Sequence, residues 1–322
     1  MEKGSVRPKI VISKCLGFEP CRYNGGIQND EFIKKLDKYV DFISVCPETA
    51  IGLKTPRDPI RIIQNKEGVA LIQPKTGLDV SKAMYEFSSD FLSSLEEIDG
   101  FILKSRSPSC GMKDVKIYPS GEKGRSSNKG KGFFAVAAQE KLPHLAMEDE
   151  GRLKDFKIRE HFLTKIYILS EFRNLKSEKS LKNLMDFHNR NKLLFMAYSQ
   201  KYLKYLGNIL GNNDKKNDDE VLKLYGEGLH QLLSRAPRYT SNINVLMKAM
   251  GYFSDKLSHS EKIFILDTID KYRNGNLTFS VPLYVIKSYV VRFNEHRLLN
   301  QSFFSPYPEE LIELRDSGKV TH

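Results

Sequence analysis

Hydrophobic and polar positions follow two different rhythms in the two halves of the chain. Up to about residue 150, short apolar runs alternate with segments of helical spacing. This alternation is typical of a parallel sheet covered by helices, so we predict an α/β domain with a Rossmann-like, doubly wound and mostly parallel sheet. The predicted buried strands are residues 9–15, 40–46 and 100–105, and the predicted helices are residues 29–39, 81–98 and 133–142.

Some local features of this half are predictable in more detail. Residues 60–65 and 68–74 are apolar runs on either side of a Lys-Glu pair, a spacing that favours a β-hairpin. Asn29 stands where the helical spacing of residues 29–39 begins, and its short polar side chain predicts an N-cap. Residues 120–132 are rich in glycine and lysine and predict a loop.

From about Leu153 onward, helical periods dominate the pattern. We therefore predict an all-α second domain and place the two domains at residues 1–152 and 153–322. A chain of 322 residues is long enough for two separate cores. The predicted helices are residues 156–175, 180–210, 218–236, 241–257, 259–275 and 282–304, with a solvated loop at 211–219.

The composition narrows the class of protein. Hydrophobic residues make up 40% of the chain and charged residues 28%, which is ordinary for a soluble globular protein. The longest apolar runs are shorter than a membrane span, so we expect no membrane partner. Because the first residues lack the apolar core of a signal peptide, we expect a cytoplasmic location.

Positive charge is concentrated in the second half. Residues 1–155 contain 25 Lys and Arg against 22 Asp and Glu, a net charge of +3, whereas residues 156–322 contain 26 against 18, a net charge of +8. An excess of this kind suits the phosphate backbone of RNA. The basic residues that we select as RNA-binding candidates are Arg190, Lys192, Arg235, Arg238 and Lys248, with His188 and Tyr239 among them. A solvated helix face is the alternative for these charges.

Three of the four cysteines follow predicted strands. Cys15, Cys46 and Cys110 each come shortly after an apolar run, and the carboxyl ends of parallel strands meet at one edge of a sheet. Three thiolates at that edge suit a [4Fe–4S] cluster whose fourth iron stays open. Zinc is the competing metal, and it is disfavoured because no Cys-x-x-Cys pair or nearby histidine completes a tetrahedral site. Three buried thiols without a metal are the remaining alternative.

Other polar residues lie close to these cysteines in the sequence. Glu48, two residues after Cys46, is a candidate base for activating water, although a carboxylate at a helix start also fits that position. Ser107 and Ser109 precede Cys110 and either bind substrate or stabilise the turn. Cys21 is a fourth ligand, a sulfur relay or a bystander, and we favour the bystander because a fourth ligand would close the open iron. Candidates for substrate binding are Arg22, Arg57 and Arg61.

The segments around these residues resemble a known family. The motifs "SKCLGFEPCRYNGG", "CPETAIGLKTPRDPIRI" and "KSRSPSCGMKDVKIY" are similar to those of the thiouracil desulfurase (TudS-type) family over about residues 8–150. The motifs "FHNRNKLLFMAYS", "NVLMKAMGYFSDKLSHSEK" and "QSFFSPYPEEL" resemble the YbgA-type helical domain. The fusion in this order resembles the RudS-type branch, which is linked to removal of sulfur from 4-thiouridine in tRNA.

The resemblance implies a function and a set of site residues. It implies a [4Fe–4S] cluster held by Cys15, Cys46 and Cys110, with catalytic roles for Glu48 and for Ser107 or Ser109. The implied reaction is a non-redox desulfuration of thiolated uracil, with the substrate sulfur on the open iron and 4-thiouridine in tRNA as the expected substrate. Two rivals stay open: a desulfurase of free thiouracil or its nucleotides, whose helical domain serves dimerisation or regulation, and a non-catalytic RNA-binding protein with a structural zinc.

Overall fold

The computed structural model describes residues 6–66, 68–119, 128–211 and 215–312. Two compact units divide the chain, Met1–Ser170 and Glu171–His322. Helix α5 (Phe156–Glu178) begins in the first unit and ends in the second. Parts of the predicted loops at 120–132 and 211–219 lie outside the described residues.

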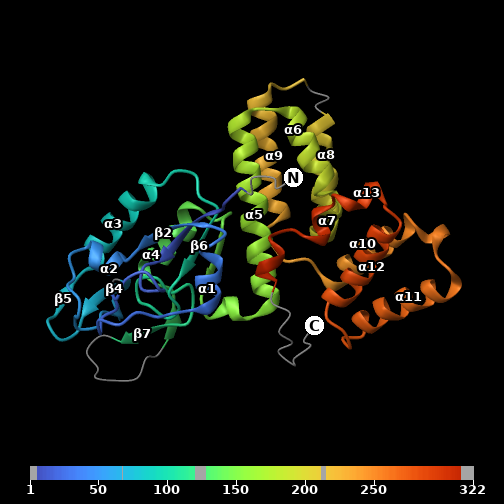
Figure 1. The fold of residues 1–322 in the computed structure, drawn as a ribbon. Coiled ribbons are helices and arrows are strands. Elements are labelled where there is room, and N and C mark those ends of the chain that lie inside the picture. Colours follow the sequence, from blue (N-terminus) through green and yellow to red (C-terminus); the bar gives the residue numbers. More distant parts are fainter. Residues whose placement is uncertain (1–5, 67, 120–127, 212–214, 313–322) are drawn as a thin grey trace. The chain divides into compact units, whose positions relative to one another are not determined.

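A four-stranded parallel sheet forms the centre of the first unit (Figure 1). Its order is β2-β1-β6-β9, with every neighbouring pair parallel, so the predicted α/β class is confirmed. Ser13, the last residue of β1, pairs with Val45, the last residue of β2, so these two strands end at the same level. The strands are β1 (Lys9–Ser13), β2 (Asp41–Val45), β6 (Gly100–Leu103) and β9 (Ala146–Asp149).

The first unit also contains a second sheet, which the sequence pattern does not predict as a whole. Its strands come between β2 and β9 in the chain. The predicted hairpin is present, since β3 (Arg61–Asn65) pairs antiparallel with β4 (Gly68–Gln73). The order is β5-β4-β3-β7-β8, and β7 is parallel to β3. The remaining strands are β5 (Leu78–Asp79), β7 (Val115–Pro119) and β8 (Asn128–Gly130). Strands β5 and β8 have only two and three residues, which is too short for hydrophobic periodicity to detect.

Four α-helices belong wholly to the first unit: α1 (Glu31–Leu36), α2 (Pro47–Ala50), α3 (Ser81–Ser94) and α4 (Phe133–Lys141). The N-cap prediction for α1 was wrong by one residue. The cap is Asp30, whose Oδ1 accepts a hydrogen bond from the Ile33 amide at 3.1 Å, and not Asn29. Helices α3 and α4 pack through the rings of Phe87, Phe91 and Phe134, while Ile10, Ile12 and Phe101 are fully buried in the central strands.

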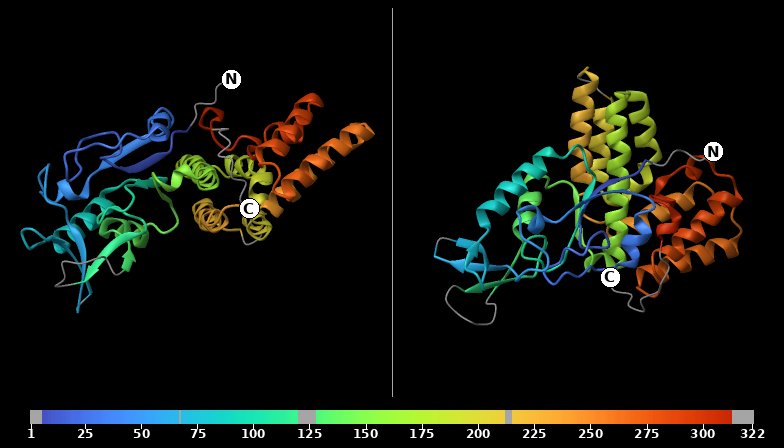
Figure 2. Two further views of the ribbon diagram at one scale, coloured as in Figure 1. Left: turned by 90° about the horizontal axis from the view of Figure 1, so that it is seen from below. Right: turned by 60° about the vertical axis from the view of Figure 1, so that its left-hand side comes forward.

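The described part of the second unit is all-helical, as predicted. Helices α11 and α12 lie side by side within it (Figure 2). The helices after α5 are α6 (Leu181–Arg190), α7 (Lys192–Tyr198), α8 (Gln200–Gly211), α9 (Asp218–Leu232), α10 (Tyr239–Gly251), α11 (His259–Arg273), α12 (Ser280–Arg292) and α13 (His296–Leu299). Short 3₁₀ turns occupy Arg152–Lys154, Ser254–Lys256, Ser302–Phe304 and Glu309–Leu311.

The single helix predicted over residues 180–210 was wrong, because three helices occupy it. The buried Asn191 ends α6. Its side-chain Nδ2 donates to the Phe187 carbonyl at 2.9 Å, and its Oδ1 accepts a hydrogen bond from the Ser302 hydroxyl. Ser199, at φ −163° and ψ 114°, ends α7 in an extended conformation. Side chains of this kind form hydrogen bonds that compete with the helix, a tertiary effect that spacing does not register.

Aromatic rings fill the core of the second unit. The rings of Phe172, Phe187, Phe195 and Tyr225 contact one another, and His188 lies among them. The Nδ1 atom of His188 lies 3.0 Å from the Tyr225 hydroxyl, and burial lowers the pKa of His188 to about 4. The expectation that His188 contributes to an RNA-binding surface was therefore wrong, because its ring is a buried core residue.

Candidate functional site

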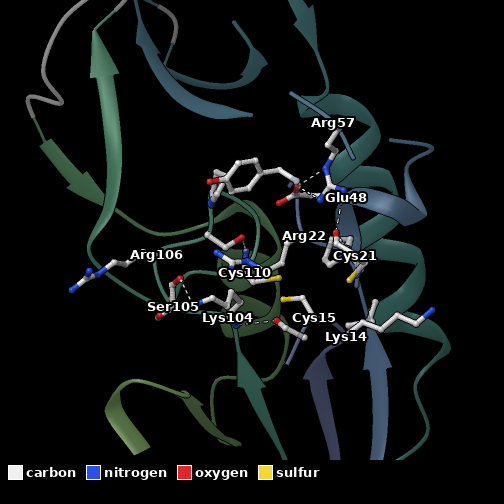
Figure 3. Close-up of a pocket in the computed structure, with 17 residues that line it drawn as sticks. Lys14, Cys15, Cys21, Arg22, Glu48, Arg57, Lys104, Ser105, Arg106 and Cys110 are labelled. Atoms are coloured by element: carbon white, nitrogen blue, oxygen red, sulfur yellow. Dashed lines mark hydrogen bonds and ion pairs between the residues drawn. The ribbon is translucent and has the colours of Figure 1, made fainter. Parts of the chain in front are cut away.

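A cavity of about 350 Å³ opens where β1, β2 and β6 end (Figure 3). All four cysteines of the chain line it, although they come from three separate segments. We call it the cysteine cavity. Its size is within the range of pockets that bind small molecules. Its other lining residues are Ser13, Lys14, Arg22, Tyr23, Val45, Pro47, Glu48, Arg57, Lys104, Ser105, Arg106, Ser107 and Pro108.

The ends of the parallel strands bring the thiols together. Cys15 follows the last residue of β1 by two positions, and Cys46 follows β2 directly and is the N-cap residue of α2. Cys46 Sγ lies 4.0 Å from the carbonyl oxygen of Cys21, so the buried Cys21 belongs to the same cluster of thiols. The thiols of Cys15 and Cys110 point toward one another (Figure 3).

A tight turn after β6 positions Cys110. The Ser107 hydroxyl accepts hydrogen bonds from the amides of Ser109 (3.2 Å) and Cys110 (3.1 Å). Helix α4 begins against this turn, because the Phe133 amide donates to the Pro108 carbonyl at 3.1 Å. A Cβ on Gly111 would come within 2.3 Å of Val115 and 2.7 Å of the Ser107 carbonyl oxygen, so only glycine fits this close approach. The turn therefore depends on both its serine and its glycine.

The environment disfavours free thiolates in the cysteine cavity. Burial raises the pKa of the Cys110 thiol well above its usual value. Burial and the neighbouring Cys46 raise the pKa of Cys15 to about 11, against the opposing charges of Lys104 and Arg22. Burial and Cys46 likewise raise the pKa of Cys21 to about 12. Thiolates gathered here need a positively charged group among them.

The donor set fits an iron–sulfur cluster. Four cysteine thiols in one cavity are the ligand type that such clusters use, and the described lining contains no histidine. Across the described residues, no three His, Cys, Asp or Glu side chains lie close enough together to hold one metal ion. This spacing is compatible with a four-iron cluster, because its cysteines bind separate irons.

One side of the cavity carries a carboxylate held by two partners. The Arg57 guanidinium donates to Glu48 Oε2 from Nε at 3.0 Å and from Nη2 at 2.5 Å, and Ser109 Oγ donates to Oε1 at 2.9 Å. The two side chains of the ion pair are only 5% (Arg57) and 13% (Glu48) exposed. The Nη1 atom of Arg57 donates to the Cys21 carbonyl at 3.1 Å. Arg57 therefore connects the carboxylate to the loop that carries Cys21.

The two candidate serines have different positions. Ser109 is fully buried and bonded to Glu48, whereas Ser107 lines the cavity beside Cys110. This arrangement gives Ser109 a positioning contact and Ser107 access to a bound molecule. Their roles in catalysis stay predictions.

A second buried charge pair, not found by the sequence analysis, lies on the other side of the cavity. Lys104 forms an ion pair with Glu150, whose side chain is 3% exposed. Glu150 also accepts from the Ser105 amide at 2.8 Å and hydroxyl at 2.7 Å. Burial alone would raise the pKa of Glu150, but the hydrogen bonds from Lys104 and Ser105 keep it below the usual value. An apolar strand followed by a lysine, in "GFILKS", was the available signal for this pair.

The other two arginines predicted to bind substrate, Arg22 and Arg61, lie in different cavities. Arg22 lines the cysteine cavity, whereas Arg61 lines a neighbouring cavity and places its guanidinium 4.7 Å from the centre of the Tyr118 ring. Substrate binding by either residue stays a prediction. Figure 3 shows Lys14 and Arg106 pointing away from the thiols.

The basic residues of the second unit differ in exposure. Lys192, Arg235, Arg238 and Lys248 are exposed, whereas Arg190 is half-buried in an ion pair with Glu171. Their contact with RNA stays a prediction. Among the described residues, no helix is both long and apolar enough to span a membrane.

Comparisons with known proteins match the two halves separately. Residues 10–150 match the 2-thiouracil desulfurase family, and residues 192–308 match a family described as a protein of unknown function, DUF1722. The uncharacterized protein YbgA of Escherichia coli (strain K12) is 32% identical over 158 residues, which cover 48% of this chain and 93% of that protein. The uncharacterized protein YbbK of Bacillus subtilis (strain 168) is 38% identical over 109 residues, which cover 32% of this chain and 72% of that protein.

A solved structure was also found, described as the [4Fe-4S]-dependent thiouracil desulfidase TudS. It is 28% identical, and the match covers 46% of this chain and 94% of that one, with a TM-score of 0.37.

Proposed function

The chain belongs to the 2-thiouracil desulfurase family in its first half and to the YbgA-like DUF1722 family in its second, and on this premise we propose that it desulfurates a thiolated uracil bound in the cysteine cavity. The observation that carries the proposal is the convergence of four thiols and Glu48 on one cavity. The proposed substrate is 4-thiouridine in tRNA, and the proposed place of action is the cytoplasm.

The proposed cofactor is a [4Fe–4S] cluster held by Cys15, Cys46 and Cys110. When bound, it would supply a soft iron centre that polarises a thiocarbonyl bond. The strand ends fix the backbone of Cys15 and Cys46, and the Ser107 hydroxyl fixes the turn before Cys110. The positive charges of Lys104 and Arg22 lie close enough to Cys15 to favour its thiolate form. Cys21 is proposed to be a neighbour of the cluster and not a ligand.

The proposed reaction is hydrolysis and balances without electron transfer. Water adds to the thiocarbonyl carbon, a carbon–oxygen bond forms, the carbon–sulfur bond breaks, and the products are uridine and hydrogen sulfide. Glu48 is the proposed base, because its carboxylate lines the cavity and Oε1, which accepts a single hydrogen bond from Ser109, keeps a second lone pair for a water proton. Arg57 and Ser109 hold this carboxylate in one orientation. Ser107 is the proposed hydrogen-bond donor to the substrate ring.

The charge of the second half supports a large substrate. Its net charge of +8 and the exposed Arg235, Arg238 and Lys248 suit a phosphate backbone. A free thiobase offers nothing for these residues to bind. The rival proposal is a desulfurase of free thiouracil or thiouridine nucleotides. It follows from the family's description as a 2-thiouracil desulfurase and gives the helical unit a role in dimerisation or regulation.

The experiment compares substrates on the full chain purified without oxygen. Sulfide release is measured from tRNA that contains 4-thiouridine, from 4-thiouridine nucleoside and from free 4-thiouracil and 2-thiouracil. The proposal predicts the highest kcat/KM for the tRNA, with a KM that rises with salt. A preference for free bases and no salt dependence would favour the rival. Zinc without iron, together with no sulfide from any substrate, would favour a non-catalytic RNA-binding protein.

A further inference from the structure

A second cavity adjoins the cysteine cavity and has no role in the reaction described above. Its volume is about 500 Å³. Three residues, Tyr23, Arg106 and Pro108, line both cavities, so the two share one wall. The second cavity therefore lies directly beside the cysteine cavity. The other lining residues are Pro59, Ile60, Arg61, Asp114, Val115, Lys116, Tyr118 and Lys129.

The second cavity is strongly basic. Four of its lining residues are basic and one, Asp114, is acidic. Asp114 is already paired with Lys129, at 3.1 Å. Lys116 is exposed and forms no ion pair with any other described residue. Positive charge therefore exceeds negative charge where a ligand would lie, which favours a phosphate group.

Aromatic rings lie among these charges. The Arg61 guanidinium stacks 4.7 Å from the centre of the Tyr118 ring, which leaves a flat cation at the cavity wall. Tyr23, in the shared wall, is 46% exposed although it is a large aromatic residue. Flat cations and exposed aromatic rings are the surfaces on which unpaired bases stack.

The backbone of Arg106 is held in an unusual conformation. Its φ of 58° lies in the left-handed region, which a residue with a long side chain rarely adopts. Arg106 points away from the thiols (Figure 3), and it lines both cavities. This conformation places a cation at the junction of the two cavities.

From these features we infer that the second cavity binds the nucleotide adjoining the thiolated uridine in a polynucleotide. The phosphodiester would lie near Arg106 and Lys116, and the neighbouring base would stack near Arg61 and Tyr118. The inference deepens the proposed function and rests on it, because it assumes that the thiolated base occupies the cysteine cavity. It assigns part of the RNA recognition to the first unit.

The test uses the full chain and four substrates: 4-thiouridine, its 5′-monophosphate, and the two dinucleotides that carry uridine on the 5′ or on the 3′ side of 4-thiouridine. At least one dinucleotide is expected to have a higher kcat/KM than the nucleoside. Lys116→Ala should lower kcat/KM for that dinucleotide about tenfold, through a lost phosphate contact, and leave the nucleoside within about twofold. Arg61→Ala should lower kcat/KM for the dinucleotide by a similar factor, through a lost stacking surface. Lys82→Ala, an exposed lysine of α3 outside both cavities, is the matched control.

A binding measurement separates this inference from the proposed function. Titration with the unmodified dinucleotide UpU should give a dissociation constant about tenfold higher for Lys116→Ala than for the wild type. The inference would be overturned if Lys116→Ala bound UpU as tightly as the wild type does, or if it lost kcat/KM equally for the nucleoside and the dinucleotide. It would also be overturned if the 5′-monophosphate had the same kcat/KM as the better dinucleotide, because the neighbouring nucleoside would then contribute nothing. Failure of the proposed function is a different result: no sulfide from any substrate with the wild type.

Discussion

The two units differ in where their charged residues of interest lie: ion pairs beside the cysteine cavity are buried in the first unit, and the selected basic residues are mostly exposed in the second. In the first unit, the pairs Arg57–Glu48 and Lys104–Glu150 are buried beside a cavity. In the second, the buried core is aromatic and four of the five selected basic residues are exposed. A buried charge pair holds one geometry, and an exposed charge adapts to a flexible partner at little cost. This difference agrees with the proposed division of labour, in which the first unit carries out the chemistry and the second attracts a polyanion.

The largest expected effect is on the cysteines. Cys15→Ala, Cys46→Ala and Cys110→Ala should each lose most of the iron and reduce sulfide release to background. Cys21→Ala is the matched control, because it removes a thiol from the same cavity but not a proposed ligand. Iron and acid-labile sulfide per chain, measured after anaerobic purification, check this. Loss of iron in Cys21→Ala alone would contradict the ligand assignment.

Glu48→Gln should separate cofactor binding from catalysis. The amide keeps a hydrogen-bonding side chain beside Arg57 and Ser109 but removes the base, so kcat should fall about 10²- to 10⁴-fold with iron content unchanged. Glu96→Gln, on an exposed carboxylate of the same unit, is the control and should match the wild type. A fully active, iron-loaded Glu48→Gln protein would remove Glu48 from the mechanism.

The two units should also differ in what a broken ion pair costs. Arg57→Ala leaves a nearly buried carboxylate without its partner, which should lower the free energy of unfolding by about 3–5 kcal/mol. Arg190→Ala breaks a pair whose side chains are 29% and 32% exposed, so its loss should be below about 1 kcal/mol. Urea unfolding of both variants measures the contrast. Equal losses would show that burial does not distinguish the two pairs.

A pH dependence should come from the core of the second unit. The pKa of His188 is lowered to about 4 by burial, against about 6.5 in the unfolded chain, so only the unfolded state takes up a proton as the pH falls between these values. The contribution of His188 to the free energy of unfolding is therefore constant above about pH 6.5. It should lower that free energy by about 3 kcal/mol when the pH reaches 4. His188→Gln, which does not titrate, should lose less stability between pH 7 and pH 4. A wild-type loss equal to that of His188→Gln would contradict this.

The smallest effect is expected from single exposed cations of the second unit. Arg235→Ala and Arg238→Ala should weaken tRNA binding a few-fold each and lower the slope of log K against log salt by about 1. kcat on 4-thiouridine nucleoside should stay unchanged. Arg273→Ala, whose cation is already paired with Asp270, is the control. An unchanged salt slope in all variants would place the tRNA contact elsewhere.

The sequence predicted the parallel sheet and the meeting of the cysteines because both follow from local pattern. Each of the apolar strands β1, β2 and β6 has a cysteine after it, and parallel topology brings strand ends together. The breaks at Asn191 and Ser199 depend on tertiary contacts or single backbone angles and were not predictable from spacing.

The hydrogen-bonding and ion-pair partners of the site residues were also not predictable from the sequence. Glu150 is far from Lys104 in the sequence, and Arg61 lines a different cavity from Arg57 although the two are only four positions apart. Strand direction and register decide such outcomes, and a period-two pattern does not specify the register between the predicted strand β3 and the unpredicted strand β7.

The most direct test of the central claim, that the cysteine cavity carries out the desulfuration, compares the amounts of the two products formed. The anaerobically purified full chain is incubated with 4-thiouridine tRNA, and uridine formed and sulfide released are measured for the wild type and for Cys110→Ala. The account predicts equal amounts of uridine and sulfide from the wild type, without an added reductant, and neither product from the variant. An iron-loaded wild type that forms no uridine, or a Cys110→Ala variant that turns over like the wild type, would contradict it.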